Sequence, residues 1–200
     1  MKITAAIFDI GNVLLPFDYM KAANRLIEEN QPVTPPDRAV VVAAKEQLEL
    51  GRIDRGEFLR RVRPLFNHTG HEGDFLAIWE DIFVPNTPMH KLVEELSEHM
   101  PLYLLSNISD IHRESIHRDY PVFRYFQSGI YSYEVGLLKP DPAIFELTAQ
   151  RLNVTPQATL FIDDMAENIA SAEAAGFCCV HYSHTDHEKA LEKIRWYLAR

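Results

Sequence analysis

Five short apolar runs, each followed by an amphipathic helical pattern, constrain the fold of this chain more than any other feature. Each run is too short and too continuously apolar for a surface helix, which predicts strands buried on both faces. Strands that alternate with helices predict a parallel sheet covered by helices on both sides, a doubly wound α/β core. The predicted strands are residues 3–8, 101–105, 128–132, 158–162 and 177–181.

Start and stop signals of the intervening helices support this alternation. Thr87 before Pro88 predicts one helix N-cap, and Asp141 before Pro142 predicts another. Gly176 is the predicted C-terminal cap of a helix that starts near residue 166. The last helix carries a single apolar stripe formed by Leu191, Ile194 and Leu198.

Residues 17–84 break the alternation, because they show helical patterns and no convincing strand. We expect residues 17–84 to be a small helical bundle inserted after the first strand of an α/β core made of residues 1–16 and 85–200. Asp54 and Glu57 form a capping-box pattern before one of its helices. The predicted helices of this insertion lie within residues 18–30, 36–50, 51–62 and 74–83.

Charge and cysteine content exclude several classes of protein. The formal net charge of -9 disfavours nucleic acid and anionic membranes as partners. Cys178 and Cys179 are adjacent and make a poor disulfide pair, which is typical of a reducing compartment. No uncharged stretch approaches the roughly 20 residues that a membrane helix needs, and Asp9 interrupts the apolar N-terminal run. We therefore expect a cytoplasmic protein.

Polar side chains stand where three of the predicted strands end. Asp9 ends the first strand, Ser106-Asn107 end the second and Asp163-Asp164 end the fourth. Ligands of open parallel sheets bind beyond the carboxyl ends of the strands. These side chains converge if the first strand is central and the second and fourth strands flank it.

Such a convergence predicts the chemistry of phosphoryl transfer. Three carboxylates cannot all stay ionised at close range without compensation. A hard divalent cation, most simply Mg2+, and Lys139 in the "GLLKPDP" loop are the two available compensators. Ser106 and Asn107 are expected to open the next helix and to supply a phosphate site there. A small phosphorylated molecule is the predicted partner, with an aspartate as its phosphoryl acceptor.

These motifs resemble those of the haloacid dehalogenase superfamily, in register along the whole chain. "FDIGNV", "LLSN", Lys139 and "FIDDMAEN" are similar to its four motifs, and the inserted helices resemble its cap. The resemblance implies that Asp9 is the nucleophile and a Mg2+ ligand, and that the backbone carbonyl of Gly11 is a second ligand. It also implies that Asp164 is a direct metal ligand and that Asp163 acts through water.

Gly11 departs from the family pattern, because phosphatases of this family usually carry an aspartate there as general acid and base. Two rival functions stay open: a metal-independent 2-haloacid dehalogenase and a non-catalytic phosphate-binding protein. The paired Asp163-Asp164 favours a Mg2+-dependent phosphomonoester hydrolase. A sub-group of phosphatases resembles the "DxGNV" pattern, and sugar phosphates are among its substrates.

Each of these residues also has an ordinary structural explanation. Asp9 could form a turn, Ser106-Asn107 an N-cap, and Asp163-Asp164 the acidic start of a helix. Asn168 either orients the acidic pair or is simply solvated. Asp18 either contacts substrate, where it could supply a proton, or caps the first cap helix.

Two further groups of side chains favour structural interpretations. The cap arginines are expected on a solvated face rather than in substrate binding: Arg52, Arg55, Arg60, Arg61 and Arg63. The spacing of the following residues fits no standard zinc site: Cys178, Cys179, His181, His184 and His187. The remaining scattered histidines are expected at the surface: His68, His71, His112 and His117.

Overall fold

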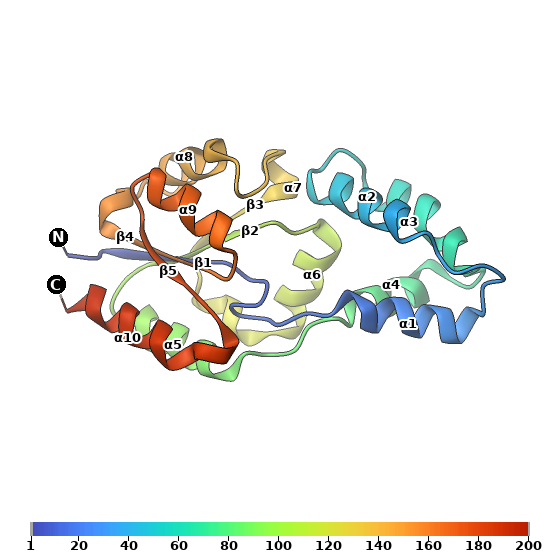
Figure 1. The fold of residues 1–200 in the computed structure, drawn as a ribbon, viewed down its shortest axis with the longest axis horizontal. Helices are drawn as coiled ribbons and strands as arrows, with labels where there is room; N and C mark the ends of the chain where they lie inside the picture. The colour runs from blue at the N-terminus through green and yellow to red at the C-terminus, as the bar shows by residue number, and fades with distance from the viewer. Residues whose placement is uncertain (1, 200) are drawn as a thin grey trace.

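A five-stranded parallel sheet forms the centre of the computed structural model, which describes residues 2–199 (Figure 1). Its strands are β1 (Ala5–Phe8), β2 (Leu102–Ser106), β3 (Ser128–Tyr131), β4 (Thr159–Asp163) and β5 (Cys178–His181). The strand order is β3-β2-β1-β4-β5, so that β1 is paired on its two sides with β2 and β4. The predicted doubly wound α/β class is confirmed, and the carboxyl ends of β1, β2 and β4 are neighbours.

Alternate side chains of the strands pack on opposite faces of the sheet. Phe8 and Ile162 belong to the apolar cluster on one face, and Ile7 and Phe161 belong to the cluster on the other. The helices that cover these faces are visible on the two sides of the sheet in Figure 1: α5 (Thr87–Ser97) and α10 (His187–Leu198) on one, α8 (Pro142–Arg151) and α9 (Ala166–Ala174) on the other.

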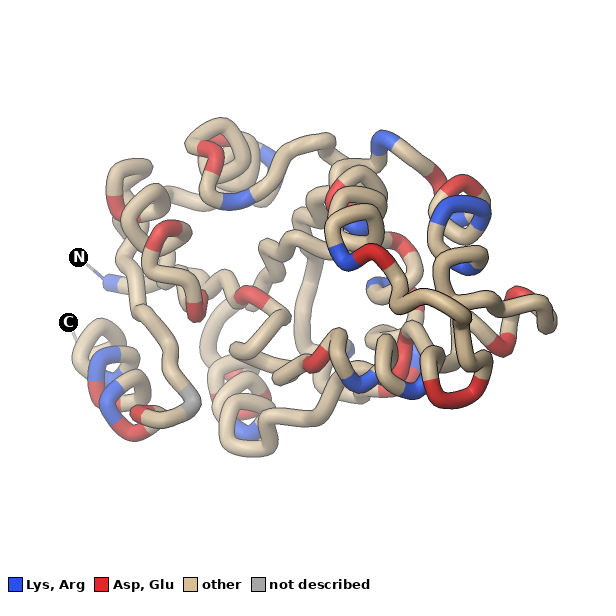
Figure 2. The backbone as a smooth tube through the Cα atoms, turned by 45° about the vertical axis from the view of Figure 1, so that its right-hand side comes forward, with Lys and Arg blue, Asp and Glu red and all other residues tan. Residues whose placement is uncertain are grey.

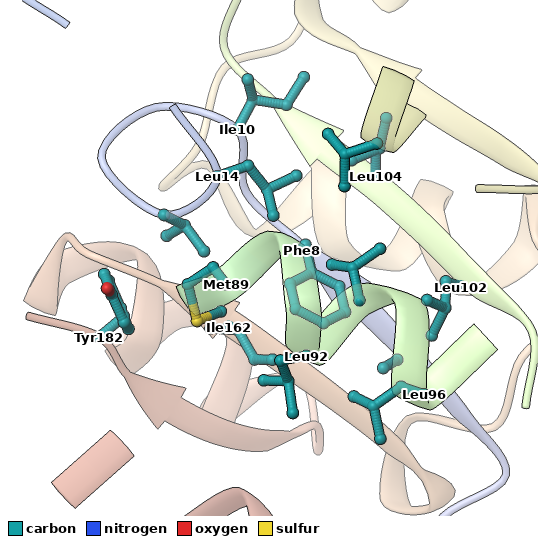
Figure 3. Close-up of a cluster of buried hydrophobic side chains, with 14 of the residues drawn as sticks. Phe8, Ile10, Leu14, Met89, Leu92, Leu96, Leu102, Leu104, Ile162 and Tyr182 are labelled. Carbon is teal, nitrogen blue, oxygen red and sulfur yellow. The ribbon is translucent and has the colours of Figure 1, made fainter. Parts of the chain in front are cut away.

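Helix α5 contributes a continuous apolar stripe to the first of these clusters. Met89, Leu92 and Leu96 lie over Phe8 and its neighbours (Figure 3). Their three- and four-residue spacing places all three side chains on one helix face, which explains why the helix docks along its length.

Helices α1–α4 come between β1 and α5 in the chain and lie at one end of the molecule (Figure 1). They share an apolar cluster that includes Leu26, Phe58, Phe75 and Trp79. The remaining helical elements are α1 (Tyr19–Asn30), α2 (Arg38–Glu49), α3 (Arg55–Val62), η1 (Arg63–Phe66), α4 (Glu72–Glu80), α6 (Asp110–Asp119), η2 (Pro121–Tyr125), α7 (Ser132–Val135), η3 (Pro156–Ala158) and η4 (His184–Asp186).

Helix caps follow the sequence signals in most places. Asp141 caps α8 by accepting a hydrogen bond from the backbone of Ala143, and Asp54 caps α3 by accepting from the backbone of Glu57. The prediction of Thr87 as an N-cap was one residue late, because Asn86 is the N-cap of α5. Asn86 is buried and donates to the carbonyl of Val13, a partner that local sequence does not reveal.

No helix within residues 2–199 combines the length and the apolar character needed to cross a lipid bilayer.

Candidate active site

A buried lysine joins two of the predicted carboxylates. The Nζ atom of Lys139 lies 2.9 Å from Oδ1 of Asp9 and 2.6 Å from Oδ2 of Asp163, and it donates a third hydrogen bond to the carbonyl of Leu105 at 2.9 Å. All three protons of the ammonium group are therefore directed by the protein. In this arrangement Lys139 fixes the orientation of the Asp9 carboxylate.

Asp163 and Asp164 are adjacent but differ in their surroundings. Asp163 is fully buried, and its Oδ1 accepts hydrogen bonds from the backbone of Met165 and the side chain of Asn168, both at 2.9 Å. Asp164 is partly exposed and accepts one hydrogen bond from Asn12 on Oδ2 at 3.0 Å. Asp163 thus anchors Lys139, and Asp164 is the better placed of the pair to offer an oxygen to a ligand.

Asn12 contacts the carboxylate cluster and is one of the site residues that sequence reasoning missed. It lies in the loop after β1 with a left-handed backbone (φ 54°), a conformation that asparagine tolerates better than most residues. Its backbone N–H donates to the carbonyl of Leu15, and its amide reaches Asp164. The asparagine directly after "DIG" was the available signal, because this residue type is enriched at left-handed turn positions.

Burial and charge shift the proton affinities of this group. Burial raises the pKa of Asp9 to about 6, with a further contribution from the charges of Asp163 and Asp164 and against the attraction of Lys139. Burial also raises the pKa of Asp164, against the hydrogen bond from Asn12. Burial lowers the pKa of Lys139, but Asp9 and Asp163 outweigh it, so its pKa lies above the usual value.

The donor set fits a divalent cation. Asp9, Asp163 and Asp164 each offer an oxygen, and these oxygens lie within 4.8 Å of one another. The negative charge of three ionised carboxylates exceeds the positive charge of the one ammonium group beside them. A hard cation with oxygen ligands would balance this excess negative charge. Asp9 and Asp164 are the side chains that could ligate it directly, because the Asp163 oxygens are occupied by Lys139, Met165 and Asn168.

The loop after β2 differs from the prediction. Ser106 and Asn107 do not open a helix, because α6 begins at Asp110 with Ser109 as its N-cap. The amide of Asn107 instead forms two hydrogen bonds with the backbone of Lys139, accepting from its N–H at 2.8 Å and donating to its carbonyl at 2.9 Å. Asn107 therefore holds the lysine loop in place, and Ser106 ends β2 at the cavity.

A cavity of about 330 Å³ lies above these side chains. The core lines it with the predicted residues Asp9, Gly11, Ser106, Asn107, Lys139, Asp164 and Asn168. Residues from or beside the α1–α4 segment line it as well: Phe17, Tyr19, Lys45, Glu49 and Phe83. His112 of α6 completes this side of the cavity.

Asp18 is not among the residues that line this cavity. Its carboxylate accepts a hydrogen bond from the backbone of Met20 at 2.8 Å and caps α1, which is the structural alternative considered above. Asn168 takes the orienting role, since its amide donates to Asp163 in a buried setting.

The prediction of a surface position for His112 was wrong. This side chain is 1% exposed, because rings from Tyr19, Trp79 and Phe83 surround it. Its Nε2 atom lies 3.1 Å from the carbonyl of Trp79, and burial lowers its pKa to about 4. The enclosing rings come from segments distant in sequence, which no local pattern reveals.

Cap arginines form ion pairs, and side chains of the cysteine–histidine segment have hydrogen-bond partners of their own. Arg60 and Arg61 pair with Glu57, and Arg63 pairs with Glu72. Figure 2 shows basic and acidic residues interspersed along the chain. Arg55 pairs with Asp110 and Glu114 of α6. Four side chains of the cysteine–histidine segment form hydrogen bonds with four different residues: Cys178 with Gln157, Cys179 with Phe177, His181 with Asp164 and His187 with Tyr182. The His184 side chain lies outside the described residues.

Comparison with known proteins assigns this geometry to a family. A profile of haloacid dehalogenase-like hydrolases matches residues 3–176. The chain belongs to this family. It is 26% identical over 187 residues to the sesquiterpene phosphatase astK of Aspergillus oryzae, covering 88% of each chain. It is 26% identical over 181 residues to the D-ribitol-5-phosphate phosphatase of Bacteroides thetaiotaomicron, covering 86% of this chain and 87% of the relative.

A solved structure from the same family is similar along nearly the whole chain. A haloacid dehalogenase family enzyme from Bacteroides thetaiotaomicron has a TM-score of 0.85 at 25% identity, covering 96% of this chain and 99% of that one. Its complex with magnesium and inorganic phosphate has a TM-score of 0.79 at 26% identity, covering 90% and 94% of the two chains.

Proposed function

We propose that this hydrolase is a Mg2+-dependent phosphatase of a small phosphorylated metabolite, acting through an aspartyl-phosphate on Asp9. The carboxylate cluster carries the proposal, because Asp9, Asp163 and Asp164 surround a single ammonium group at the base of a cavity. A metal-independent dehalogenase that attacks carbon has no need of this excess negative charge. The magnesium and phosphate bound by the Bacteroides enzyme support the same choice.

Each side chain has a role in this mechanism. Asp9 attacks phosphorus in line, while Lys139 holds its carboxylate and Asn107 holds the lysine loop. Mg2+, bound by Asp9, Asp164 and the carbonyl of Gly11, would neutralise charge on the phosphoryl oxygens. The Ser106 hydroxyl faces the same cavity and is available to a phosphoryl oxygen. As Asp9 attacks, the ester P–O bond breaks and the alcohol leaves; water then hydrolyses the aspartyl-phosphate, which releases inorganic phosphate and restores the Asp9 carboxylate.

Residues 17–84 act in this proposal as the cap, and residues 1–16 and 85–200 as the catalytic core. The apolar cluster that α1–α4 share supports this division, since most of its members come from this segment and Ile111 of α6 joins it from the other part of the chain. Closure over the cavity would exclude bulk water and select the substrate. The two relatives are phosphatases named for very different compounds, a sesquiterpene and D-ribitol 5-phosphate. For this chain we propose a sugar phosphate as the substrate.

Phosphate release tests the proposal. The wild-type protein is expected to release phosphate from acetyl phosphate and from sugar phosphates with Mg2+, and to lose this activity in excess chelator. Asp9→Asn is expected to abolish turnover while circular dichroism shows an intact fold, because an amide is not a nucleophile toward phosphorus. Full activity in chelator together with halide release from a 2-haloacid would establish the dehalogenase alternative.

A further inference from the structure

An ion pair on the cap side of the cavity has no role in the chemistry above. Lys45 and Glu49 lie one turn apart on α2, and Nζ of Lys45 donates to Oε1 and Oε2 of Glu49 at 2.9 and 2.8 Å. Both residues line the cavity above Asp9, and Glu49 is 8% exposed. The Lys45 side chain is 25% exposed, so the desolvation cost falls mainly on the buried Glu49 carboxylate, and a purely structural position would be served as well by apolar side chains.

Two neutral polar rings complete this group. The ring of Tyr19 lies 5.1 Å from Nζ of Lys45, and its hydroxyl interacts with Glu49; burial and this carboxylate raise the pKa of Tyr19 well above its usual value. His112 contacts the Trp79 carbonyl through Nε2, which must therefore carry the proton, and its low pKa keeps the ring uncharged. Its Nδ1 atom is then a hydrogen-bond acceptor.

The group provides what an alcohol with several hydroxyls requires. Lys45 uses two of its N–H groups on Glu49 and keeps a third donor. Tyr19 and His112 keep acceptor capacity, and a hydroxyl both donates and accepts. All four side chains line the cavity whose floor is the proposed nucleophile, so they would meet the part of the substrate beyond the phosphate.

An apolar groove lies behind this polar wall. It has a volume of about 410 Å³ and runs between α1 and α2, lined by side chains that include Met20, Ala23, Ile27, Val41 and Val42. Phe17, Tyr19 and Lys45 line both the groove and the cavity, so they separate the two spaces. An apolar chain attached to a phosphate at Asp9 would lie beside the Lys45–Glu49 pair, with Phe17 and Phe83 on the same cavity wall, before it reached the groove.

We propose that Tyr19, Lys45, Glu49 and His112 form a leaving-group subsite that selects a short hydroxylated alcohol, a polyol or a sugar, over an apolar chain. The inference rests on the proposed phosphatase function. Hydroxyls of the substrate exchange hydrogen bonds with this group, whereas an apolar chain leaves its buried polar atoms without partners.

Steady-state kinetics with matched esters tests the subsite. The ratio of kcat/KM for a pentitol phosphate to that for n-pentyl phosphate is expected to exceed about tenfold in the wild type. Glu49→Gln is expected to reduce this ratio about tenfold, chiefly through KM for the pentitol ester. Because hydroxyls also lower the pKa of the leaving alcohol, the change in the ratio between proteins decides the question rather than the ratio itself.

Glu46→Gln is the matched control, since Glu46 is exposed on the same helix and does not line the cavity. It is expected to keep the wild-type ratio. Tyr19→Phe, which retains the ring, provides a second variant if Glu49→Gln folds poorly, and it too is expected to lower the ratio.

The outcomes separate the two proposals. If acetyl phosphate is not hydrolysed with Mg2+, the phosphatase function fails and the subsite fails with it. If acetyl phosphate is hydrolysed but n-pentyl or isoprenyl phosphate is preferred, the subsite alone is wrong. An unchanged ratio in both Glu49→Gln and Tyr19→Phe would likewise overturn it and assign the ion pair to stability of the cap.

Discussion

Asn12 shows how one backbone conformation shapes the proposed metal site. Its left-handed φ aims the amide at Asp164, the carboxylate best placed to bind a cation. Asn12→Gly keeps this φ accessible and removes only the amide. We expect the Mg2+ concentration for half-maximal activity to rise at least about tenfold, with little change in kcat at saturating Mg2+.

Asn153→Gly is the control for this variant, because Asn153 has a similar φ of 53° after α8 and is not among the residues lining the cavity. It is expected to leave the Mg2+ dependence unchanged. A Mg2+ titration of phosphate release measures both proteins, and equal curves for Asn12→Gly and the wild type would remove Asn12 from the metal site.

Residues that follow strand ends were predictable, and residues that act through the backbone were not. Asp9, Asp163 and Asp164 meet because parallel strands end at one edge of the sheet, a rule that needs only strand order. The two hydrogen bonds between the Asn107 side-chain amide and the backbone of Lys139, 32 residues further along the chain, were not predicted. Pairing at such separations depends on loop geometry that sequence patterns do not encode.

At the scale of elements, the loop from β1 to α1 decides how the leaving group departs. Gly11 stands where related phosphatases carry the general acid, and a Cβ atom there would lie 2.8 Å from the ring of Phe17. That ring packs edge-on against Tyr19 and Phe83. The loop is therefore built around a glycine, and Asp18, which caps α1, does not replace the missing acid.

We therefore expect a steep dependence of kcat/KM on the pKa of the leaving group. Without a positioned acid, aryl, acyl and sugar 1-phosphates should be far better substrates than simple alkyl phosphates, since an acid typically contributes about 10²–10⁴ in rate. A series of phosphate esters with graded leaving-group pKa measures the slope of log kcat/KM against that pKa. The slope is compared between the wild type and the double variant Gly11→Asp/Phe17→Ala, in which the loss of the Phe17 ring makes room for the new carboxylate. A shallow wild-type slope would show that another group, such as Lys45, protonates the leaving oxygen.

Strands and capped helices were predictable as elements, whereas short elements were not. All five strands lie within two residues of their predicted bounds, because a buried parallel strand is a continuous apolar run. The start of α6 was placed three residues too early, since Ser106, Asn107 and Ser109 are all good caps and only Ser109 is used. Helix α7 was not predicted, because four residues are too few to show a helical period.

At the scale of the whole molecule, two titratable groups of opposite kind are buried along one cavity: His112 on α6, where it packs against Tyr19 and Trp79, and Asp9 after β1. Burial keeps His112 neutral by lowering its pKa to about 4, and keeps Asp9 partly protonated by raising its pKa to about 6. As pH falls from 6.5 to 4, the unfolded chain gains a proton at His112 that the folded protein does not, so this group lowers stability in acid. Composition alone could not predict this, because both shifts arise where segments distant in sequence meet.

The contribution of Asp9 to stability has the opposite pH dependence, and we expect replacement of its carboxylate to change the unfolding free energy. Between its ordinary pKa of 3.8 and its folded value of about 6, the folded protein holds a proton that the unfolded chain has released. Stability from this group is therefore lost as pH rises through that window, by up to about 3 kcal/mol at neutral pH and above. Asp9→Asn carries no such loss, and Lys139 keeps Asp163 as its partner.

Urea unfolding in the presence of chelator measures this difference. At pH 8 we expect the unfolding free energy of Asp9→Asn to exceed that of the wild type by about 1 to 3 kcal/mol, the upper figure corresponding to a shift of about two pKa units. The difference is expected to shrink toward pH 4. Added Mg2+ should stabilise the wild type at pH 8 and narrow the gap, because the cation compensates the same charge. A difference that stays constant from pH 4 to pH 8 would mean that Asp9 is ionised equally in both states and that the buried carboxylates are not under electrostatic strain.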